Sequence, residues 1–228
     1  MKNRYIILSE KQWHEDLFNK LKSEFNNIEW LLINKKADFN LQLLNEFKPD
    51  KIFIPHWSYI IPEEIFNSFD CIVFHMTDLP FGRGGSPLQN LIVRGFKSTK
   101  ISAIKVQSGI DTGDVYLKKS LDLTGSAQEI FQKSAVVIEE MIKEIIIKKN
   151  IPSPQIGEVV EFNRRKPEES NISELEDLEN IYNYIRMLDC EGYPNAFIET
   201  KYFKAEFTNA NFNESGKIIT ANVRIVKR

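Results

Sequence analysis

Cysteine is scarce in this chain of 228 residues, which has only Cys71 and Cys190. No spacing of Cys and His along the sequence matches a zinc site, so we expect no metal centre. Cys71 lies within an apolar run, which favours a buried free thiol. The low cysteine content is typical of proteins in a reducing compartment, so the sequence predicts a cytoplasmic protein.

Long apolar runs are also missing. Every apolar run is far shorter than the roughly 18 residues that indicate a membrane-spanning helix. The first residues, MKNRYIILSEK, lack the apolar core of a secretion signal. We therefore expect neither a membrane partner nor secretion.

An excess of positive charge is absent as well. Thirty Lys and Arg residues stand against 32 Asp and Glu residues, which gives a formal net charge of −2. Proteins that bind nucleic acid neutralise its phosphates with Lys and Arg, and the basic cluster Arg164-Arg165-Lys166 is short and typical of a solvated surface. The balance argues against a nucleic acid partner, while a local basic face stays compatible with it.

The ten glycines form no nucleotide-binding fingerprint. The first apolar run is followed by Ser9-Glu10-Lys11 rather than by GxGxxG. The stretch Phe81-Gly82-Arg83-Gly84-Gly85 lacks the GK[ST] ending of a phosphate-binding loop. Neither NAD nor ATP is supported as a cofactor.

Residues 1–150 show an alternation of strand and helix patterns. Short apolar runs predict strands, at Tyr5–Leu8, Trp30–Ile33, Lys51–Pro55, Cys71–His75, Lys100–Gln107 and Val115–Ser120. Helical spacing or helix-start residues predict helices, at Lys11–Phe25, Leu41–Phe47, Pro62–Phe69, Pro87–Arg94 and Ala127–Lys149. This order predicts an α/β fold, a Rossmann-like and mostly parallel sheet with helices on both faces.

The rest of the chain has a different composition. Residues 151–174 are rich in proline and charge, which indicates a linker. Residues 175–228 predict a small C-terminal α+β subdomain, with a helix at Leu175–Leu188 and strands at Phe197–Thr208 and Lys217–Val226. We therefore expect a main domain over 1–150, a linker over 151–174 and a small subdomain over 175–228.

Two residues that can move protons follow predicted strands. His75 ends the apolar run Cys71–Phe74, and Asp111 lies in a Gly-flanked loop after the run Ile101–Val106. Open α/β sheets build their sites at strand ends, and a histidine paired with a carboxylate acts as a general acid and base. The pair predicts an enzyme that moves a proton during group transfer. Each residue also has a structural reading, as a strand-end histidine or as the aspartate of an Asp-Thr-Gly turn.

The motif His75-Met76-Thr77-Asp78-Leu79-Pro80, together with Gly109-Ile110-Asp111-Thr112-Gly113-Asp114, resembles the folate-dependent formyltransferase family. In that family an apolar strand ends in Asn-x-His, a Ser-Leu-Leu-Pro loop follows, and an aspartate lies in a Gly-flanked loop. Ser58-Tyr59-Ile60-Ile61-Pro62 is similar to the segment that lines the pterin pocket. The resemblance covers roughly residues 50–200.

The resemblance implies a formyltransferase catalytic domain over 1–150 that uses N10-formyltetrahydrofolate and no metal. His75 and Asp111 would be catalytic, with His75 polarising the formyl carbonyl and moving protons while Asp111 orients it. The residues implied for the folate are Ser58, Tyr59, Ile60, Ile61, Gly109, Ile110 and Thr112. Those implied for the acceptor substrate are Thr77, Arg83, Gly84 and Gly85.

One position departs from the family motif. The asparagine two residues before the family histidine is Val73 here. In the family that amide helps to hold the formyl oxygen as it gains negative charge, and valine has no donor. Protonated His75, a backbone N–H, or a side chain would have to replace it, the side-chain candidates being Ser58, Thr77 and His56.

The acceptor is inferred from chain length and charge. Family members that act on tRNA have a longer C-terminal region, and this chain is slightly acidic. We therefore favour a sugar N-formyltransferase, which would act on the amine of a nucleotide-linked amino-deoxysugar for a surface glycan. The alternatives are an enzyme like methionyl-tRNA formyltransferase and a degenerate protein that binds folate or a nucleotide sugar without turnover. Whether the chain forms a homodimer stays open.

Overall fold

A computed structural model describes residues 2–213 and 217–227. The chain divides into two compact units. Unit 1 consists of Met1–Arg83, Lys100–Leu121 and Gln132–Glu161, and unit 2 of Gly84–Thr99, Asp122–Phe131 and Phe162–Arg228. Each unit is thus built from segments that are distant in sequence, and the linear division at residues 150 and 174 stays a prediction.

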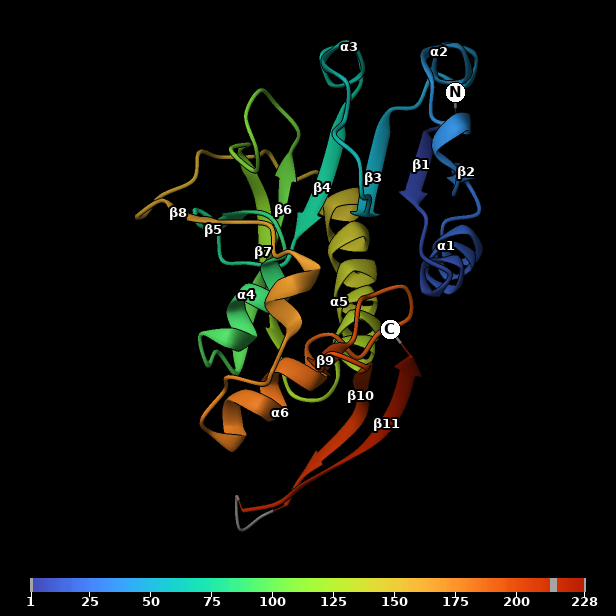
Figure 1. Ribbon diagram of the computed structural model, residues 1–228. Coiled ribbons are helices and arrows are strands. Elements are labelled where there is room, and N and C mark those ends of the chain that lie inside the picture. Colours follow the sequence, from blue (N-terminus) through green and yellow to red (C-terminus); the bar gives the residue numbers. More distant parts are fainter. Residues whose placement is uncertain (1, 214–216, 228) are drawn as a thin grey trace. The chain divides into compact units, whose positions relative to one another are not determined.

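The main sheet has six strands in the order β2-β1-β3-β4-β6-β7 (Figure 1). Their bounds are Arg4–Ser9 (β1), Glu29–Ile33 (β2), Lys51–His56 (β3), Cys71–His75 (β4), Ser98–Lys105 (β6) and Val115–Asp122 (β7). The pairs β1–β2, β1–β3 and β3–β4 are parallel, and β4–β6 is antiparallel. The predicted α/β fold with a mostly parallel sheet is therefore confirmed.

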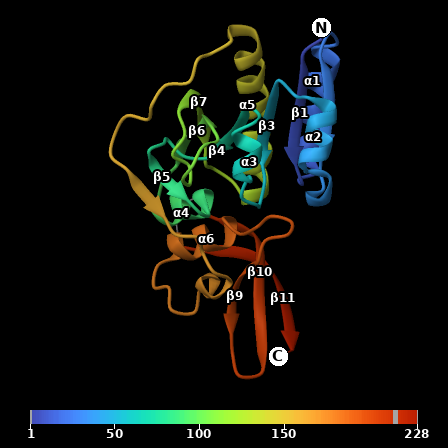
Figure 2. The ribbon, with the colours of Figure 1, turned by 90° about the horizontal axis from the view of Figure 1, so that it is seen from above.

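Helices cover both faces of this sheet (Figures 1 and 2). Helix α2 (Leu41–Phe47) and helix α3 (Glu63–Phe66) pack through Leu44 and Ile65 against the face that carries Ile6 and Leu8 of β1. Side chains alternate along a strand, so Tyr5 and Ile7 point to the opposite face.

The other pair of helices in unit 1 lies side by side. Helix α1 (Trp13–Glu24) and helix α5 (Ala127–Lys148) are joined by the ion pairs Lys20–Glu139 and Lys143–Glu24. Within the described residues, no helix is long and apolar enough to cross a membrane. The helix predicted at Pro62–Phe69 is one turn, Glu63–Phe66, and helix η1 (Lys36–Asp38) is an addition that the sequence pattern did not predict.

A short strand pair joins two segments that were expected to be irregular. Strand β5 (Phe81–Gly84) lies in the loop after β4, and strand β8 (Val160–Phe162) lies in the predicted linker. The N–H of Val160 donates to the carbonyl of Pro80, which follows a cis peptide bond with Leu79. Neither segment is long enough to have a period-2 pattern, so the pairing was not predictable from hydrophobicity.

Unit 2 contains a three-stranded antiparallel sheet in the order β11-β10-β9. Its elements are α4 (Pro87–Val93), η2 (Pro167–Ser170), α6 (Leu178–Arg186), β9 (Ala196–Glu199), β10 (Phe203–Phe212) and β11 (Ile219–Lys227). The single strand expected over Phe197–Thr208 is wrong, because Thr200 closes a turn by accepting hydrogen bonds from the backbone of Tyr202 and Phe203. Helix α6 begins later than expected because Asp177 caps it, accepting from the N–H of Asn180.

Candidate active site

His75 ends β4 and is held by the loop that follows it. Its Nε2 lies 2.7 Å from the carbonyl oxygen of Gly82, and the Thr77 hydroxyl donates to the same oxygen at 3.2 Å. A carbonyl oxygen only accepts hydrogen bonds, so Nε2 carries a proton. The residue is only 8% exposed. Nδ1 is therefore the ring nitrogen whose protonation can change.

Asp111 reaches His75 from a strand that runs in the opposite direction. Because β6 is antiparallel to β4, its last residue Lys105 lies level with Ile72, near the start of β4. The loop after β6 then returns along the sheet, and Asp111 Oδ2 lies 3.5 Å from His75 Nδ1. Asp111 thus lies in the loop after a strand, as expected, but it reaches His75 only because that loop returns along the sheet. The loop brings them together.

The returning loop has a defined shape. Asp111 has a φ of +54°, a conformation that aspartate tolerates better than most residues. The Thr112 hydroxyl donates to the carbonyl of Ser108 at 2.8 Å. A Cβ on Gly113 would lie 1.7 Å from the carbonyl oxygen of Lys105, so only glycine fits there. These contacts fix the path that carries Asp111 back to His75.

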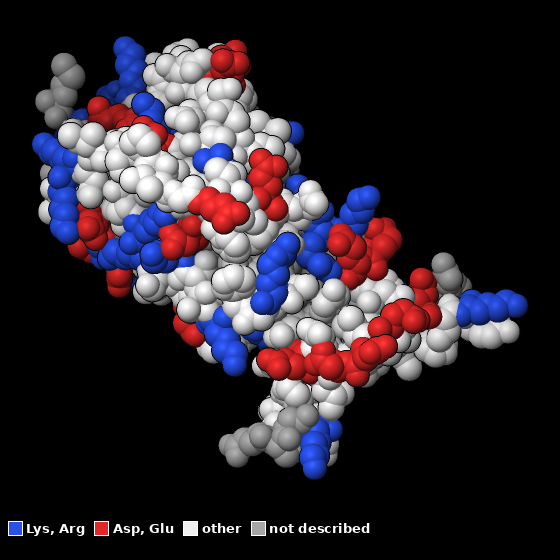
Figure 3. Space-filling model, turned by 90° about the vertical axis from the view of Figure 1, so that its left-hand side faces the viewer, with Lys and Arg blue, Asp and Glu red and all other residues white. Residues whose placement is uncertain are grey.

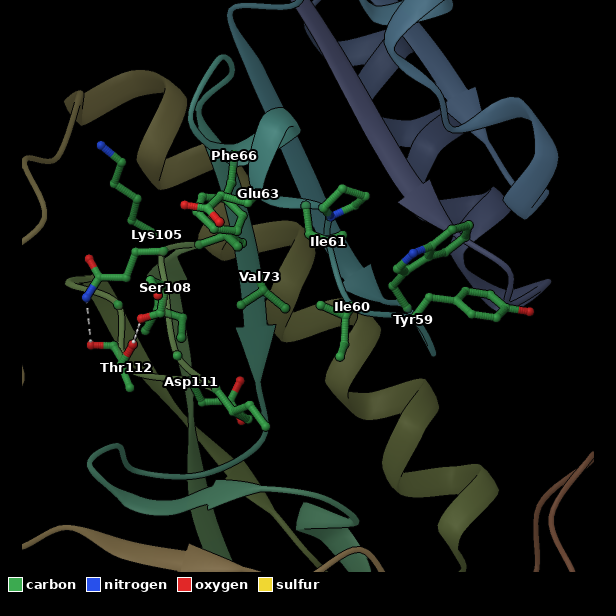
Figure 4. A pocket seen from close by; sticks show the side chains of 18 of the residues that line it. Tyr59, Ile60, Ile61, Glu63, Phe66, Val73, Lys105, Ser108, Asp111 and Thr112 are labelled. Atoms are coloured by element: carbon green, nitrogen blue, oxygen red, sulfur yellow. Dashed lines mark hydrogen bonds between the residues drawn. The ribbon is translucent and has the colours of Figure 1, made fainter.

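A cavity of about 510 Å³ opens beside the pair (Figure 4). Its walls are the segments 57–63 and 104–113, together with Phe66 and Val73. All seven residues expected to contact folate line it, namely Ser58, Tyr59, Ile60, Ile61, Gly109, Ile110 and Thr112. Asp111 also lines the cavity, whereas His75 is buried, does not line it and contacts Asp111. The folate roles of these residues stay a prediction.

Val73 forms an apolar part of the cavity wall, as Figure 4 shows. Among the candidate replacements for the family amide, the Thr77 hydroxyl and His75 Nε2 are engaged with Gly82. Burial and the charge of Lys11 lower the pKa of His56 to about 4, so its ring is neutral near pH 7. Of the remaining candidates, Ser58 and the backbone of the lining segments belong to the cavity wall.

The four residues expected to contact the acceptor are not among those that line this cavity. Thr77 is fully buried. Arg83 donates from Nε and Nη2 to Gln155 Oε1, at 3.1 and 2.8 Å. A Cβ on Gly84 would lie 2.4 Å from the carbonyl oxygen of Phe162, and one on Gly85 would lie 2.6 Å from Arg164 Cβ. The two glycines are thus required by the neighbouring backbone, and a substrate role for these four residues stays a prediction.

Asp78 anchors the loop between β4 and β5. It pairs with Lys118 at 2.6 Å and with Lys100 at 2.9 Å. Burial alone would raise the pKa of Asp78, but the hydrogen bonds from the two lysines outweigh it and hold the pKa below its ordinary value. Lys118 also donates to the carbonyl of Leu79. Asp78 and Lys118 together therefore help to fix the loop between β4 and β5.

Cys71 is a buried free thiol, as the sequence predicted. Burial, together with the charge of Asp70, raises its pKa to about 12, so the thiol stays protonated. In the part of the chain that the structure describes, no group of three or more His, Cys, Asp or Glu residues is placed to hold a metal ion.

Sequence reasoning missed Gln155, which lies in the predicted linker. Its Nε2 donates to the carbonyl oxygens of Asp111 and Gly113, both at 2.8 Å. Nothing in the local pattern around IPSPQIG distinguishes this glutamine from a solvated linker residue. Only the fold reveals that it touches the loop of Asp111.

Comparison with protein families and known proteins identifies the fold. Residues 16–141 match the family model described as formyl transferase. The chain belongs to the formyl transferase family. Residues 167–226 match a second model, described as the C-terminal domain of methionyl-tRNA formyltransferase. The resemblance drawn from the motifs of His75 and Asp111 and the prediction of a formyltransferase are thereby confirmed at the level of the family.

Two proteins similar to this chain are both named methionyl-tRNA formyltransferase. A structure named methionyl-tRNA formyltransferase from Clostridium thermocellum is 49% identical, with a TM-score of 0.95, over 99% of this chain and 100% of that one. The methionyl-tRNA formyltransferase of Rickettsia bellii is 28% identical over 195 residues, which are 80% of this chain and 64% of that protein. This chain thus spans less than two thirds of the length of the Rickettsia enzyme.

More distant solved formyl transferase folds show the architecture alone. HypX from Aquifex aeolicus, solved in complex with tetrahydrofolic acid, is 18% identical with a TM-score of 0.75 over 94% of this chain and 39% of that one. A sugar N-formyltransferase from Shewanella sp FDAARGOS_354 is 14% identical with a TM-score of 0.69, over 88% and 94% of the two chains. The predicted donor, N10-formyltetrahydrofolate, is the one used by the formyl transferase family.

These findings overturn the expected acceptor. The prediction of a sugar N-formyltransferase with a nucleotide-linked amino sugar as partner is wrong, because the strong similarities are to methionyl-tRNA formyltransferases. The argument against a nucleic acid partner is wrong for the same reason. Both rested on net charge and on the length of the C-terminal region, and neither quantity describes the local surface that an acceptor meets.

Proposed function

We propose that this chain transfers a formyl group from N10-formyltetrahydrofolate to the amine of methionyl-tRNA. The observation that carries the proposal is the 49% identity, over 99% of this chain, with the methionyl-tRNA formyltransferase from Clostridium thermocellum. The match of residues 167–226 to the C-terminal domain of such enzymes supports the same acceptor. The proposed compartment is the cytoplasm.

The cavity beside Asp111 suits the donor. Its volume of about 510 Å³ is in the range of small-molecule sites. Aromatic and aliphatic side chains such as Trp57, Ile61 and Phe66 offer flat apolar contact to a heterocycle. The irregular segments 58–61 and 107–113 place backbone N–H and C=O groups at the same cavity, where they can pair with the polar edge of a pterin.

The pair His75 and Asp111 gives the site its acid and base. When bound, the donor supplies a formyl carbon that is open to attack by the acceptor amine. The new C–N bond requires the amine to lose a proton and the leaving nitrogen of the donor to gain one. His75 Nδ1 can take up and return that proton, because Nε2 is committed to Gly82. Asp111, at 3.5 Å, stabilises the ring when it is doubly protonated.

The negative charge that develops on the formyl oxygen needs a donor other than residue 73. Val73 offers none, and Ser58 or a backbone N–H of the lining segments takes that role in our proposal. The site is therefore expected to work with a weaker stabilisation of this charge than an amide would provide. Slow turnover, rather than absence of turnover, is the expected consequence.

A tRNA partner is compatible with the surface charge. Figure 3 shows Lys and Arg side chains interspersed with Asp and Glu over the visible face. The net charge of −2 is thus a small difference between 30 and 32 opposite charges rather than a lack of basic groups. Phosphate contacts depend on the local arrangement of lysines and arginines, so the net charge does not exclude them.

The test is a direct assay of formyl transfer. Purified protein is incubated with N10-formyltetrahydrofolate and methionyl-tRNA, and the methionine released from the tRNA is analysed by mass spectrometry. The expected product is N-formylmethionine, whose formation is lost in His75→Ala. The absence of product with wild-type protein, while calorimetry still detects folate binding, would favour a binding protein that does not catalyse transfer.

A further inference from the structure

Gln155 uses its whole hydrogen-bonding capacity within unit 1. Its Nε2 donates to the carbonyls of Asp111 and Gly113, both at 2.8 Å. Its Oε1 accepts from Nε and Nη2 of Arg83, at 3.1 and 2.8 Å. An amide has two donor hydrogens and two acceptor lone pairs, and all four are satisfied here. The two carbonyls require a donor and the guanidinium requires an acceptor, so only one orientation of the amide fits.

These contacts close a ring around the imidazole of His75. On one side, Nδ1 faces Asp111 Oδ2 at 3.5 Å, and the carbonyl of Asp111 accepts from Gln155. On the other side, Nε2 meets the carbonyl of Gly82, the residue directly before Arg83. Arg83 then donates to Gln155 and completes the circuit. The loop of Asp111 on one side of His75 and the loop of Gly82 on the other are thus linked by hydrogen bonds to the same glutamine.

The segment that carries Gln155 is itself fixed. Ser153 and Val115 exchange two backbone hydrogen bonds, at 2.8 and 3.0 Å. Further along, the N–H of Val160 donates to the carbonyl of Pro80 at 3.3 Å. Gln155 therefore extends from a tethered segment, and its amide can restrain the loop of Asp111 rather than follow it.

We propose that Gln155 is a positioning residue for the reaction, which holds the loop of Asp111 and the loop of Gly82 at a fixed separation across His75. The proposal rests on the proposed function. Gln155 acts through the backbone of Asp111 and through Arg83. Loss of its two donor contacts releases the loop of Asp111, so that the carboxylate can move away from Nδ1.

The variant that isolates this role is Gln155→Glu. A carboxylate of the same length still accepts from Arg83 but cannot donate to the carbonyls of Asp111 and Gly113. We expect kcat for formyl transfer to fall about 10- to 100-fold, as for a displaced catalytic group, and the KM for the donor to change by a smaller factor. Gln155→Met, which has the same length and no charge, is expected to show the same fall in kcat relative to the change in KM. Gln42→Glu, on the exposed side of α2, is the matched control and is expected to behave as wild type.

A second readout does not depend on turnover. The chain has three histidines, so the ring nitrogens of His75 can be assigned by ¹⁵N NMR of wild type and His75→Asn. In wild type the Nε2 signal is expected to be that of a protonated nitrogen at every pH measured. The pH dependence of the Nδ1 signal is expected to change in Gln155→Glu and in Gln155→Met. It is expected to stay as in wild type in Gln42→Glu.

The outcomes separate the two proposals. If wild-type protein forms no N-formylmethionine but the His75 signals change in both Gln155 variants, the proposed acceptor is wrong and the positioning role stands. If wild-type protein is active and both folded Gln155 variants keep its kcat and its His75 signals, the positioning role is overturned. Should Gln155→Glu not fold, Gln155→Met alone decides, and unchanged kcat and signals in it would again overturn the proposal.

Discussion

Asp111 Oδ2 lies 3.5 Å from His75 Nδ1, although the strands that precede the two residues run in opposite directions. The contact depends on a loop that turns back after β6 and places Asp111 in a left-handed conformation. The carboxylate faces the cavity on one side and the imidazole on the other. Asp111 therefore connects the proposed folate site to the histidine that would move the proton.

Replacement of Asp111 by Asn removes the charge of the side chain while keeping its size. The amide keeps the size of the side chain but cannot stabilise a doubly protonated His75, so we expect kcat for formyl transfer to fall about 10²- to 10⁴-fold. The KM for the folate donor should stay close to the wild-type value. Steady-state kinetics with methionyl-tRNA measure both quantities. Asp38→Asn, at the exposed end of helix η1, is the control. An Asp111→Asn enzyme with wild-type kcat would show that the carboxylate takes no part.

Much of unit 1 was predictable because its elements have clear periodicity. Helix α2 was expected at Leu41–Phe47 and strand β4 at Cys71–His75, and both are found within these bounds. The pair of His75 and Asp111 was predictable because each residue follows a strand and belongs to a recognisable motif, although the returning loop that joins them was not. The features that could not be predicted are those that depend on residues far away in the sequence. Strands β5 and β8 form only because each pairs with the other, and Gln155 has a role only because the chain folds back onto the loop of Asp111.

Val73→Asn should increase the rate of formyl transfer. Val73 lines the cavity where the family motif has an amide, and a donor aimed at a developing oxyanion is worth about 10²–10³ in kcat. We expect a gain of at least about 10-fold, since part of that stabilisation is already supplied by other donors. Val73→Leu adds similar bulk without a donor and should not increase kcat. If Val73→Asn also leaves kcat unchanged, the formyl oxygen is not bound next to residue 73.

Gly113→Ala should destabilise the fold and slow the reaction together. The new Cβ would lie 1.7 Å from the carbonyl oxygen of Lys105, so the loop must shift, and Asp111 is two residues away. Overpacking of this kind costs about 1–3 kcal/mol. Gly192→Ala is the comparison, because its Cβ meets nothing within 4 Å although its φ is +78°. Urea unfolding of the two variants and kcat of Gly113→Ala check this, and a Gly113→Ala protein as active as wild type would contradict it.

Two histidines, the buried His14 and the half-buried His56, should make the protein less stable in mild acid. Burial, with smaller contributions from the charges of His56 and Lys11, lowers the pKa of His14 to about 3. Burial and Lys11 lower the pKa of His56 to about 4. His14 Nδ1 lies 2.7 Å from the Ser9 hydroxyl, whose oxygen also accepts from the N–H of Lys11, and His14 Nε2 is buried without a hydrogen-bond partner. The folded protein therefore keeps both rings neutral, whereas the unfolded chain takes up protons below about pH 6.5.

The sign of the effect follows from this difference in proton uptake. The stabilisation that comes from keeping the two histidines neutral is fully present above about pH 6.5. It is lost as the pH falls toward the pKa values of the folded protein. Between pH 7.5 and 5.5, we expect His14 to account for a loss of about 1 kcal/mol in the free energy of unfolding. Urea unfolding at the two pH values measures the loss, and it should be smaller in His14→Gln, which cannot titrate, than in wild type. An equal loss in both proteins would mean that His14 is protonated in the folded state and that its neutral, buried environment has been misassigned.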